Sequence, residues 1–494
     1  MELKKVGGFS LGTLLSRVTG MGREIAFAYL FGSSALMDAF RVAFNIPNLL
    51  RDFFGEGGMN AAFVPVFSEY QEKEGQKEAN KYLSSFLLPL IIILSTVIIL
   101  GIIFSPSLIS LLAKGFEKNP EQFATAVKLT RLMFPFLLLI SLASVVMGVL
   151  MYFNRFFVTG IYTVFFNISV IISSFLLYNK IGIFGAALGI LIGGIIQLSF
   201  LLFFLPKSGI KLRKPKWRHP GVKQSFRLMV PVFFAYAATR INVAVTIFLA
   251  SLLPAGNISH MTYAYRIMQL PLGMFGVAVA VVALPELSRK AATKLDQYPY
   301  ILSSLRAVFL LSIPSVFFLL SVRLSAVRVI YERGAFIMQD SVSTASILLF
   351  YLLGIPFIAC NKVIRNVYFS HKNTKTPMKI SYIAMIFNII LAIILLNYLG
   401  VRGLALAVSL SGMMQFVLLI RPYLKALLDL KSFLLKIILV SLISTIPVLY
   451  LQKMFGYLPA LIIGGFVFGL IFVCISYILK IEEICRLLKI LNNR

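Results

Sequence analysis

Long apolar stretches separated by short polar segments run along almost the whole chain of 494 residues. Because a helix needs about 20 apolar residues to cross a bilayer, this pattern predicts fourteen membrane-spanning helices and an all-α polytopic membrane protein. The expected spans are 9–31, 36–64, 83–105, 127–152, 158–178, 182–205, 226–250, 260–287, 301–322, 342–368, 378–397, 402–421, 433–451 and 458–479.

Composition agrees with this class and excludes others. The chain is 59% hydrophobic and 13% charged, with a mean hydropathy of +0.91, whereas soluble domains are about 45–50% apolar and about 25% charged. An ordinary cytosolic enzyme, a disordered chain and a secreted disulfide scaffold are therefore excluded. The three cysteines have no CxxC spacing, so neither a metal site nor a disulfide is expected.

Basic residues are distributed unevenly between the loops. The chain has 47 Lys and Arg against 18 Asp and Glu, a net charge of +29. An even number of spans puts both termini on one side, and the loops on that side carry most of the lysines and arginines. The positive-inside rule then places both termini in the cytoplasm. A single tryptophan, Trp217, offers no stacking platform for nucleic acid.

One basic loop divides the chain near its middle. Residues 206–223 contain proline, glycine and seven Lys or Arg without an apolar period, which favours a cytoplasmic tether over anionic headgroups. The expected domains are an N-terminal lobe, a basic linker, a C-terminal lobe, and a region holding the last two spans with a cytoplasmic C-terminus: 1–205, 206–225, 226–421 and 422–494.

The two halves resemble each other. Pro135 and Pro356 interrupt long apolar runs 221 residues apart, and NKIGIFGAALG at 179–189 echoes NYLGVRGLALA at 397–407. These matches indicate an internal duplication of six spans. An even number of spans gives both halves the same orientation, so their pseudo-twofold axis is expected along the membrane normal.

Charged residues inside the first expected span point to a buried polar site, since each is costly in a bilayer unless it is paired or faces water. Arg17, Arg23 and Glu24 lie at or near membrane depth. Arg17 and Arg23 fall on different faces of an ideal helix. We expect Gly20 and Gly22 to permit a bend or unwinding that brings the two arginines together.

The second and eighth expected spans carry further polar residues. Those of the second are Asp38, Arg41, Asn45, Asn48, Arg51, Asp52 and Glu56, interrupted by Pro47 and a glycine cluster. Interrupted helices of this kind are common at transport sites. In the eighth span Arg266 and Gln269 precede Pro271, which favours a kink. Arg240 in the seventh span is another candidate.

Two interpretations of these charges stay open. In the structural one, Asp38 and Arg41 neutralise each other at i,i+3, and Arg51 with Asp52 forms an interfacial pair. In the functional one, the four arginines form an anion site, because the nearby acids offset only part of their charge. Arginine donates bidentately to phosphate and stays charged, so a phosphate or pyrophosphate headgroup fits best. The arginines are Arg17, Arg23, Arg51 and Arg266.

The last expected span, 458–479, is uncharged and contains Gly464, Gly465 and Gly469. This strip indicates either ordinary helix packing through small residues or a lipid-facing groove for a hydrocarbon tail. Motifs of catalysis, such as GxSxG, HExxH and the P-loop, are missing from the sequence. We therefore expect no catalytic residues, bound metal or cofactor.

Several long segments resemble the MviN/MurJ family of bacterial lipid II flippases, within the multidrug/oligosaccharidyl-lipid/polysaccharide exporter superfamily. They are SRVTGMGRE, GSSALMDAFRVAFNIPNLLRDFFGEGGMNAAFVPVFSEY, YRIMQLPLGMFGVAVAVVALPELSR and YERGAF. The resemblance covers essentially the whole chain. It implies two six-helix lobes in a V around a central cavity, with two further helices lining a groove for the undecaprenyl tail. The transport residues that it implies are Ser16, Arg17, Arg23, Asp38, Asn48, Arg51 and Arg266, with Glu24 and Glu56 as neighbouring acids.

The sequence departs from this family in two places. Gln269 stands where some relatives have an acid, which puts a charge partnership with Arg266 in doubt. Some members bind sodium through acids in helices 7 and 11, but spans 7, 11 and 12 contain no Asp or Glu here. We expect no conventional sodium site.

The expected function is translocation of lipid II, an undecaprenyl-pyrophosphate-linked peptidoglycan precursor, from the inner to the outer leaflet by alternating access. Expected partners are lipid II, membrane lipids and other cell-wall synthesis proteins, and not nucleic acid. Two alternatives remain: another exporter of the superfamily, for polysaccharide-lipids or drugs, and a membrane enzyme acting on polyprenyl pyrophosphates. The enzyme would need a general base or metal-binding acids near the phosphate, and none is evident.

Overall fold

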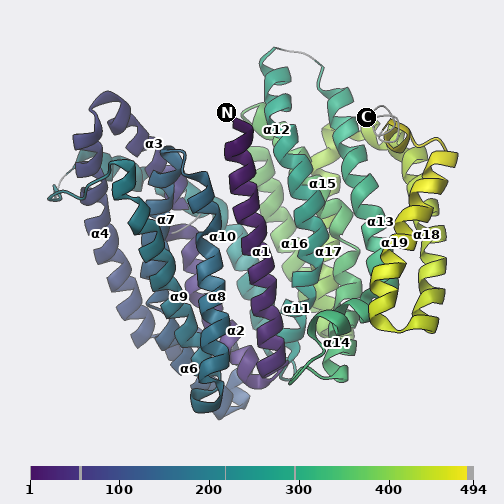
Figure 1. Cartoon of the computed structure of the whole chain (residues 1–494), viewed down its shortest axis with the longest axis horizontal. Coiled ribbons are helices and arrows are strands. Elements are labelled where there is room, and N and C mark those ends of the chain that lie inside the picture. Colours follow the sequence, from purple (N-terminus) through teal and green to yellow (C-terminus); the bar gives the residue numbers. More distant parts are fainter. Residues whose placement is uncertain (1, 55–57, 217–218, 294–295, 487–494) are drawn as a thin grey trace. The chain divides into compact units, whose positions relative to one another are not determined.

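The computed structural model describes residues 2–54, 58–216, 219–293 and 296–486, and the regular elements in these ranges are helices (Figure 1). The first ten α-helices are α1 (Glu2–Phe31), α2 (Ala35–Phe54), α3 (Gly58–Lys73), α4 (Gln76–Ile103), α5 (Ser105–Leu112), α6 (Pro120–Met133), α7 (Phe136–Tyr152), α8 (Phe156–Ile181), α9 (Ile183–Phe204) and α10 (Pro220–Ser251). They are followed by α11 (Asn257–Pro271), α12 (Val277–Ala292), α13 (Tyr298–Tyr331), α14 (Met338–Leu352), α15 (Ile355–Ser370), α16 (Lys375–Leu399), α17 (Val401–Ile420), α18 (Leu424–Phe455) and α19 (Tyr457–Ile478).

Thirteen of the predicted spans coincide with one helix or with consecutive helices separated by a short break, and the second, 36–64, includes α2, part of α3 and residues outside the described ranges. Two of these breaks fall at the prolines that were matched between the two halves. Pro135 separates α6 from α7, and α15 begins at Ile355, directly before Pro356. The helices α14 and α15 are bent by 43°. A proline lacks the N–H that would continue the preceding helix, which explains why the interruptions fall there.

Eight helical segments of the described chain are long and apolar enough to cross a membrane, or nine when the bent pair α14 and α15 counts as one span. The all-helical polytopic class is thus confirmed, while the number of crossings found in this way is smaller than fourteen. Part of the difference lies in the segment Val401–Phe455, whose 55 residues count once. Another part lies in α1 and α2, where charged residues interrupt the apolar stretch.

The helices group into two compact units. The first contains Met1–Ser259 together with Arg333–Phe336, and the second contains His260–Glu332 and Ile337–Arg494. In the first unit, α10 contacts α2, α3, α4 and α5.

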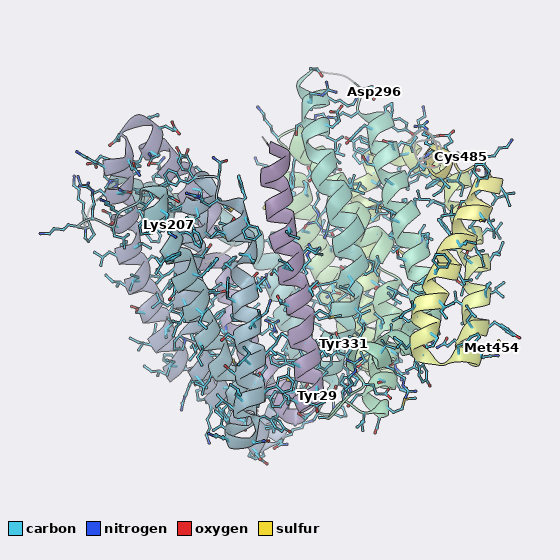
Figure 2. The ribbon with its side chains drawn as sticks, in the orientation of Figure 1. Tyr29, Lys207, Asp296, Tyr331, Met454 and Cys485 are labelled. Atoms are coloured by element: carbon cyan, nitrogen blue, oxygen red, sulfur yellow. The ribbon has the colours of Figure 1, made fainter. Side chains whose placement is uncertain are left out.

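Within each unit the long helices run side by side between two opposite ends. In the first unit, Figure 2 shows Lys207, in the basic linker, and Tyr29, near the last turn of α1, at opposite ends. In the second unit, Asp296 and Met454 are likewise at opposite ends, with Met454 beside the turn between α18 and α19 (Figure 2).

Two glycines support the predicted internal duplication. Gly182 connects α8 to α9 with φ 55° and ψ −130°, and Gly400 connects α16 to α17 with φ 57° and ψ −137°. A positive φ of this kind is readily adopted by glycine alone. The two connections lie at equivalent places in the matched segments 179–189 and 397–407, so the halves share a local backbone feature as well as a sequence pattern.

Close packing of α1 on α8 shapes the interior of the first unit. A Cβ added to Gly12 would lie 2.8 Å from the carbonyl carbon of Gly160, nearer than a side chain tolerates. The two backbones therefore meet directly, as small residues allow in membrane helices. This contact brings the polar side chains of α1 next to those of α8.

Candidate functional site

The helix α1 carries the first two candidate arginines and is continuous from Glu2 to Phe31. The expected unwinding at Gly20 and Gly22 is wrong, because both glycines lie in ordinary helix at van der Waals distance from α8. Six residues of regular helix rotate a side chain by about 600°. Arg17 is accordingly exposed, whereas Arg23 is largely buried.

A buried ion cluster joins α1 to α2. One guanidinium nitrogen of Arg23 lies 3.0 Å from Oε1 of Glu24, and one of Arg41 lies 3.2 Å from Oε2 of the same carboxylate. The side chain of Glu24 is 3% exposed, and those of Arg23 and Arg41 are 12% and 8% exposed. Two cations thus share the Glu24 carboxylate in a poorly hydrated place.

Asn167 on α8 fixes the position of Arg23. Its Oδ1 accepts a hydrogen bond from Nη1 of Arg23 at 3.1 Å, while its Nδ2 donates to the Ser16 carbonyl and to Oγ1 of Thr19, each at 3.2 Å. The guanidinium carbon of Arg23 also lies 5.7 Å from the ring centre of Phe166. This cation–π contact and the amide bond hold the guanidinium in one orientation.

Asp38, near the start of α2, is 2% exposed. One oxygen accepts from the Gly256 N–H at 2.7 Å, and the other accepts from the N–H and the hydroxyl of Ser259 at 2.8 and 2.6 Å. A carboxylate at a helix N-terminus satisfies otherwise unbonded N–H groups and complements the helix dipole. In this arrangement Asp38 connects α2 to the start of α11.

The remaining candidates of the first unit are distributed along α1 and α2. The Ser16 hydroxyl is hydrogen-bonded to that of Thr163 on α8. Asn48 and Arg51 are both half-buried on α2, beyond Pro47, which lies inside the helix. Glu56 falls outside the described residues.

Arg266 belongs to the second unit. Its Nη1 lies 3.5 Å from Oε1 of Gln269 on the same helix. The α-helical pattern of α11 ends at Pro271 and is followed by a π-helical turn over Leu272–Gly276. Such π turns are frequent at functional sites.

A polar network in the second unit was not singled out from the sequence. Nη2 of Arg365 on α15 lies 3.3 Å from Oε1 of Gln415 on α17, which also accepts from Asn361 at 3.2 Å. The amide nitrogen of Gln415 reaches the hydroxyl of Ser381 on α16 at 3.1 Å. The rule applied to Arg266, that a charge inside an apolar span is informative, would have found Arg365 as well.

Metal ligands do not gather in the described part of the chain, where no three His, Cys, Asp or Glu side chains could together hold an ion. The cysteines Cys360, Cys474 and Cys485 are all free thiols. The cations and hydrogen-bonding groups above are instead suited to an anionic or polar ligand.

Comparison with known sequences matches residues 27–478 to the family described as "Lipid II flippase MurJ". A probable lipid II flippase MurJ from Aquifex aeolicus is 34% identical over 408 residues, which cover 82% of this chain and 80% of the relative. One from Vibrio cholerae is 33% identical over 422 residues, 83% of this chain and 80% of the relative.

Solved structures give the same result. The structure of lipid II flippase MurJ in an inward closed conformation matches with a TM-score of 0.85 and 31% identity, covering 96% of this chain and 99% of that one. An inward-facing MATE family transporter of the MOP superfamily matches with a TM-score of 0.67 at 15% identity, covering 87% of this chain and 98% of that one. The second likeness concerns the fold alone. The chain belongs to the MurJ family of lipid II flippases.

Proposed function

We propose that this protein is a transporter that moves lipid II from the inner to the outer leaflet of the bacterial cytoplasmic membrane by alternating access, for peptidoglycan biosynthesis. The observation that carries the proposal is the family match over residues 27–478, together with a structural likeness to a MurJ flippase over 96% of the chain. The substrate would be bound and released without covalent change.

The residues that we propose for binding the pyrophosphate of lipid II are Arg17, Arg23, Arg51 and Arg266, and the further members of the proposed substrate-binding set are Ser16, Asp38, Asn48, Glu24 and Glu56. The cluster of Arg23, Arg41 and Glu24 supports this role, because it holds two guanidiniums in the interior of the first unit. Arginine suits this task because its planar fork donates two parallel hydrogen bonds to phosphate oxygens.

We propose an architecture of fourteen membrane crossings. Two lobes of six spans each supply twelve of them, and two additional spans follow. The segment Val401–Phe455 supports it, since 55 helical residues extend about 80 Å at 1.5 Å per residue. That length exceeds twice the apolar thickness of about 30 Å. The segment is divided at Arg421–Tyr423 into α17 and α18, so it supplies two crossings.

The last two helices would accommodate the undecaprenyl tail. α18 and α19 form a hairpin that packs on α13. Ile462, Phe466 and Leu470 on α19 are exposed apolar side chains, as a surface in contact with lipid requires. Gly469 lies on this open surface, since a Cβ added there would meet nothing within 4 Å, whereas a Cβ added to Gly465 would lie 3.3 Å from the ring of Phe318 on α13. A Gly465→Arg substitution is expected to impair transport while headgroup binding persists.

Both termini and the basic linker would lie in the cytoplasm. Within the first unit, the basic linker follows α9 and lies at the same end of the helices as the start of α4. The connection from α8 to α9 lies at the opposite end of these helices. Single cysteines at the exposed positions Lys211 and Asn179 would then react with impermeant reagents from opposite sides. Labelling of both from the periplasm would contradict this orientation.

Transport by purified protein in liposomes tests the proposed function directly. Fluorescent lipid II placed in one leaflet is expected to reach the other only when the protein is present. Chromatography of the recovered lipid separates transport from enzymatic action on polyprenyl pyrophosphates, since a flippase returns it unchanged. A cationic-drug exporter would transport an organic cation and leave lipid II in place.

A further inference from the structure

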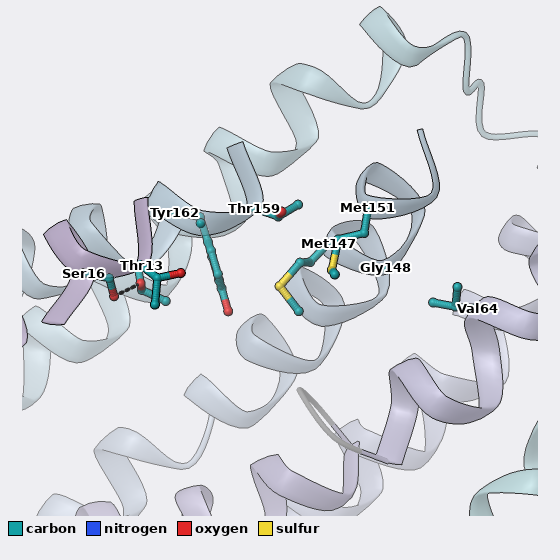
Figure 3. A pocket seen from close by; sticks show the side chains of 10 residues that line it. Thr13, Ser16, Val64, Met147, Gly148, Met151, Thr159 and Tyr162 are labelled. Atoms are coloured by element: carbon teal, nitrogen blue, oxygen red, sulfur yellow. Dashed lines mark hydrogen bonds between the residues drawn. The ribbon is translucent and has the colours of Figure 1, made fainter. Parts of the chain in front are cut away.

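A cavity of about 570 Å³ lies within the first unit, between α1, α3, α7 and α8 (Figure 3). This is within the range of about 300–1,000 Å³ typical of small-molecule sites. Its walls are lined by Thr13, Ser16, Val64, Met147, Gly148, Met151, Thr159, Gly160, Tyr162 and Thr163.

Hydroxyl groups line one wall of this cavity. Thr13 and Ser16 come from α1, and Thr159, Tyr162 and Thr163 come from α8. The direct contact between Gly12 and Gly160 keeps these two helices close enough for both sets to face the same space. The Ser16 and Thr163 hydroxyls bond each other, and that of Thr159 donates to the Phe156 carbonyl. A hydroxyl oxygen has two acceptor lone pairs, so this wall can still accept hydrogen bonds from a ligand that carries hydroxyls or amides.

The opposite wall is apolar. Figure 3 shows the ring of Tyr162 between the α1 hydroxyls and the thioethers of Met147 and Met151, with Val64 beyond them. Methionine side chains adapt their shape to irregular apolar surfaces. None of the described residues that line the cavity is charged. A neutral ligand with a polar edge and an apolar face therefore fits best, and a pyranose ring with an N-acetyl group has both.

The cavity is linked to the candidate anion site through α1. Ser16 precedes Arg23 by seven residues, which is about 10 Å along the axis and nearly two full turns, so both side chains lie on one face. Asn167 contacts both, since it bonds the Ser16 carbonyl and the Arg23 guanidinium. A pyrophosphate bound by Arg23 would thus place a directly attached sugar near the cavity.

We propose that this cavity is a saccharide subsite, which binds a neutral N-acetylated sugar of the transported headgroup while the arginines bind its pyrophosphate. The inference rests on the proposed function, because it assigns one part of the same substrate to a second place. The hydroxyl wall would recognise the polar edge of the sugar, and Met147, Met151 and Val64 would contact its apolar face and acetyl methyl.

Binding of two lipids separates this role from general anion binding. The affinity of the purified protein in nanodiscs would be measured for lipid II and for undecaprenyl pyrophosphate, which has the same tail and pyrophosphate but no sugar. Thr159→Val and Tyr162→Phe remove one hydroxyl each with little change of shape. Losing one neutral hydrogen bond costs about 0.5–1.5 kcal/mol, about two- to tenfold in affinity. We expect this loss for lipid II and unchanged affinity for undecaprenyl pyrophosphate.

Thr96→Val is the matched control, because the Thr96 hydroxyl is exposed on α4 and bonds the Ile92 carbonyl of its own helix. It should leave both affinities unchanged. If a variant fails to fold, as judged by its melting temperature, Thr13→Val provides another test of the same wall.

The outcomes distinguish the two proposals. Equal affinity of the unmodified protein for the two lipids, or an equal fall for both lipids in the variants, overturns the saccharide subsite and leaves the proposed function intact. Unchanged lipid II affinity in all folded cavity variants also overturns it. Failure of the unmodified protein to bind either lipid overturns the proposed function, and the subsite with it.

Discussion

Asp38 and Ser259 are 221 residues apart in the chain, yet the hydroxyl and the N–H of Ser259 both donate to the same carboxylate oxygen of Asp38, at 2.6 and 2.8 Å. Ser259 is completely buried and Asp38 is 2% exposed. The first turn of α11 is therefore held by a side chain of α2. A buried carboxylate that accepts several hydrogen bonds is well stabilised there, and its loss leaves N–H groups without an acceptor.

Substitution of this pair should separate the contribution of the charge from that of the hydroxyl. Asp38→Asn is expected to lower stability by about 1–3 kcal/mol, because an amide nitrogen then replaces an acceptor oxygen and N–H groups lose their partner. Ser259→Ala removes one hydrogen bond and should cost about 0.5–1.5 kcal/mol. Thermal unfolding in detergent measures the loss of stability in both variants. A loss in Ser259→Ala as large as that in Asp38→Asn would contradict the prediction that the carboxylate contributes more than the hydroxyl.

Glu24 should be more important for stability than either arginine that it contacts. Glu24→Gln leaves the side chains of Arg23 and Arg41 facing a neutral amide, and removing one partner of a buried ion pair costs about 3–5 kcal/mol. Arg23→Ala alone keeps the pair of Glu24 with Arg41 and should cost less. The double variant Arg23→Ala with Glu24→Ala deprives Arg41 of this carboxylate.

Melting temperatures and lipid II binding of these variants decide between two roles of Arg23. If Arg23 binds the substrate, Arg23→Ala weakens lipid II binding and the double variant does not restore it. If Arg23 serves only as a counter-ion to Glu24, lipid II binding stays normal in both variants and the double variant recovers transport. Such a recovery would contradict the anion-site proposal.

The basic linker is held along α4 by hydrogen bonds to its backbone. The N–H groups of Arg213 and Lys216 donate to the hydroxyls of Ser84 and Ser85, each at 2.8 Å. Replacing both serines with alanine should release the linker, and trypsin should then cleave it several times faster. Ser315→Ala is the control, because this exposed hydroxyl on α13 bonds the carbonyl of Leu311. Equal cleavage rates in all three proteins would show that these bonds do not hold the linker.

His219 should make the start of α10 sensitive to pH. Its Nδ1 accepts from the Gly221 N–H at 3.2 Å, and its ring packs on Tyr70 and Tyr82. Burial lowers the pKa of this imidazole from 6.5. Since the unfolded segment binds a proton more readily than the folded one, the stabilisation is complete above about pH 6.5 and is lost as the pH falls below it.

Hydrogen exchange at the first turn of α10 measures this effect. Exchange should speed up on acidification from pH 7 to pH 5, relative to the intrinsic rate of each amide. His219→Asn keeps a side-chain acceptor at the helix N-terminus but does not titrate, so its protection should be independent of pH over that range. The same pH dependence in both proteins would assign it to another group.

The positions of the helices could be read from the sequence, because a membrane helix satisfies its hydrogen bonds within its own segment and is set by local apolar length. The breaks at Pro135 and Pro356 were predictable for the same reason, as each proline removes an N–H from its own helix. Arg23 and Glu24 could also be singled out, since a charge at membrane depth is informative by itself.

Only the tertiary structure determined the partners of these groups. Glu24 pairs with Arg41 on the next helix as well as with its neighbour Arg23, and Asn167, 144 residues further along the chain than Arg23, holds the guanidinium in place. The unwinding expected in α1 does not occur, because packing on α8 retains a regular helix. Apolar pattern and charge locate helices and candidate residues, but helix packing selects which of them meet, and that depends on residues far apart in the chain.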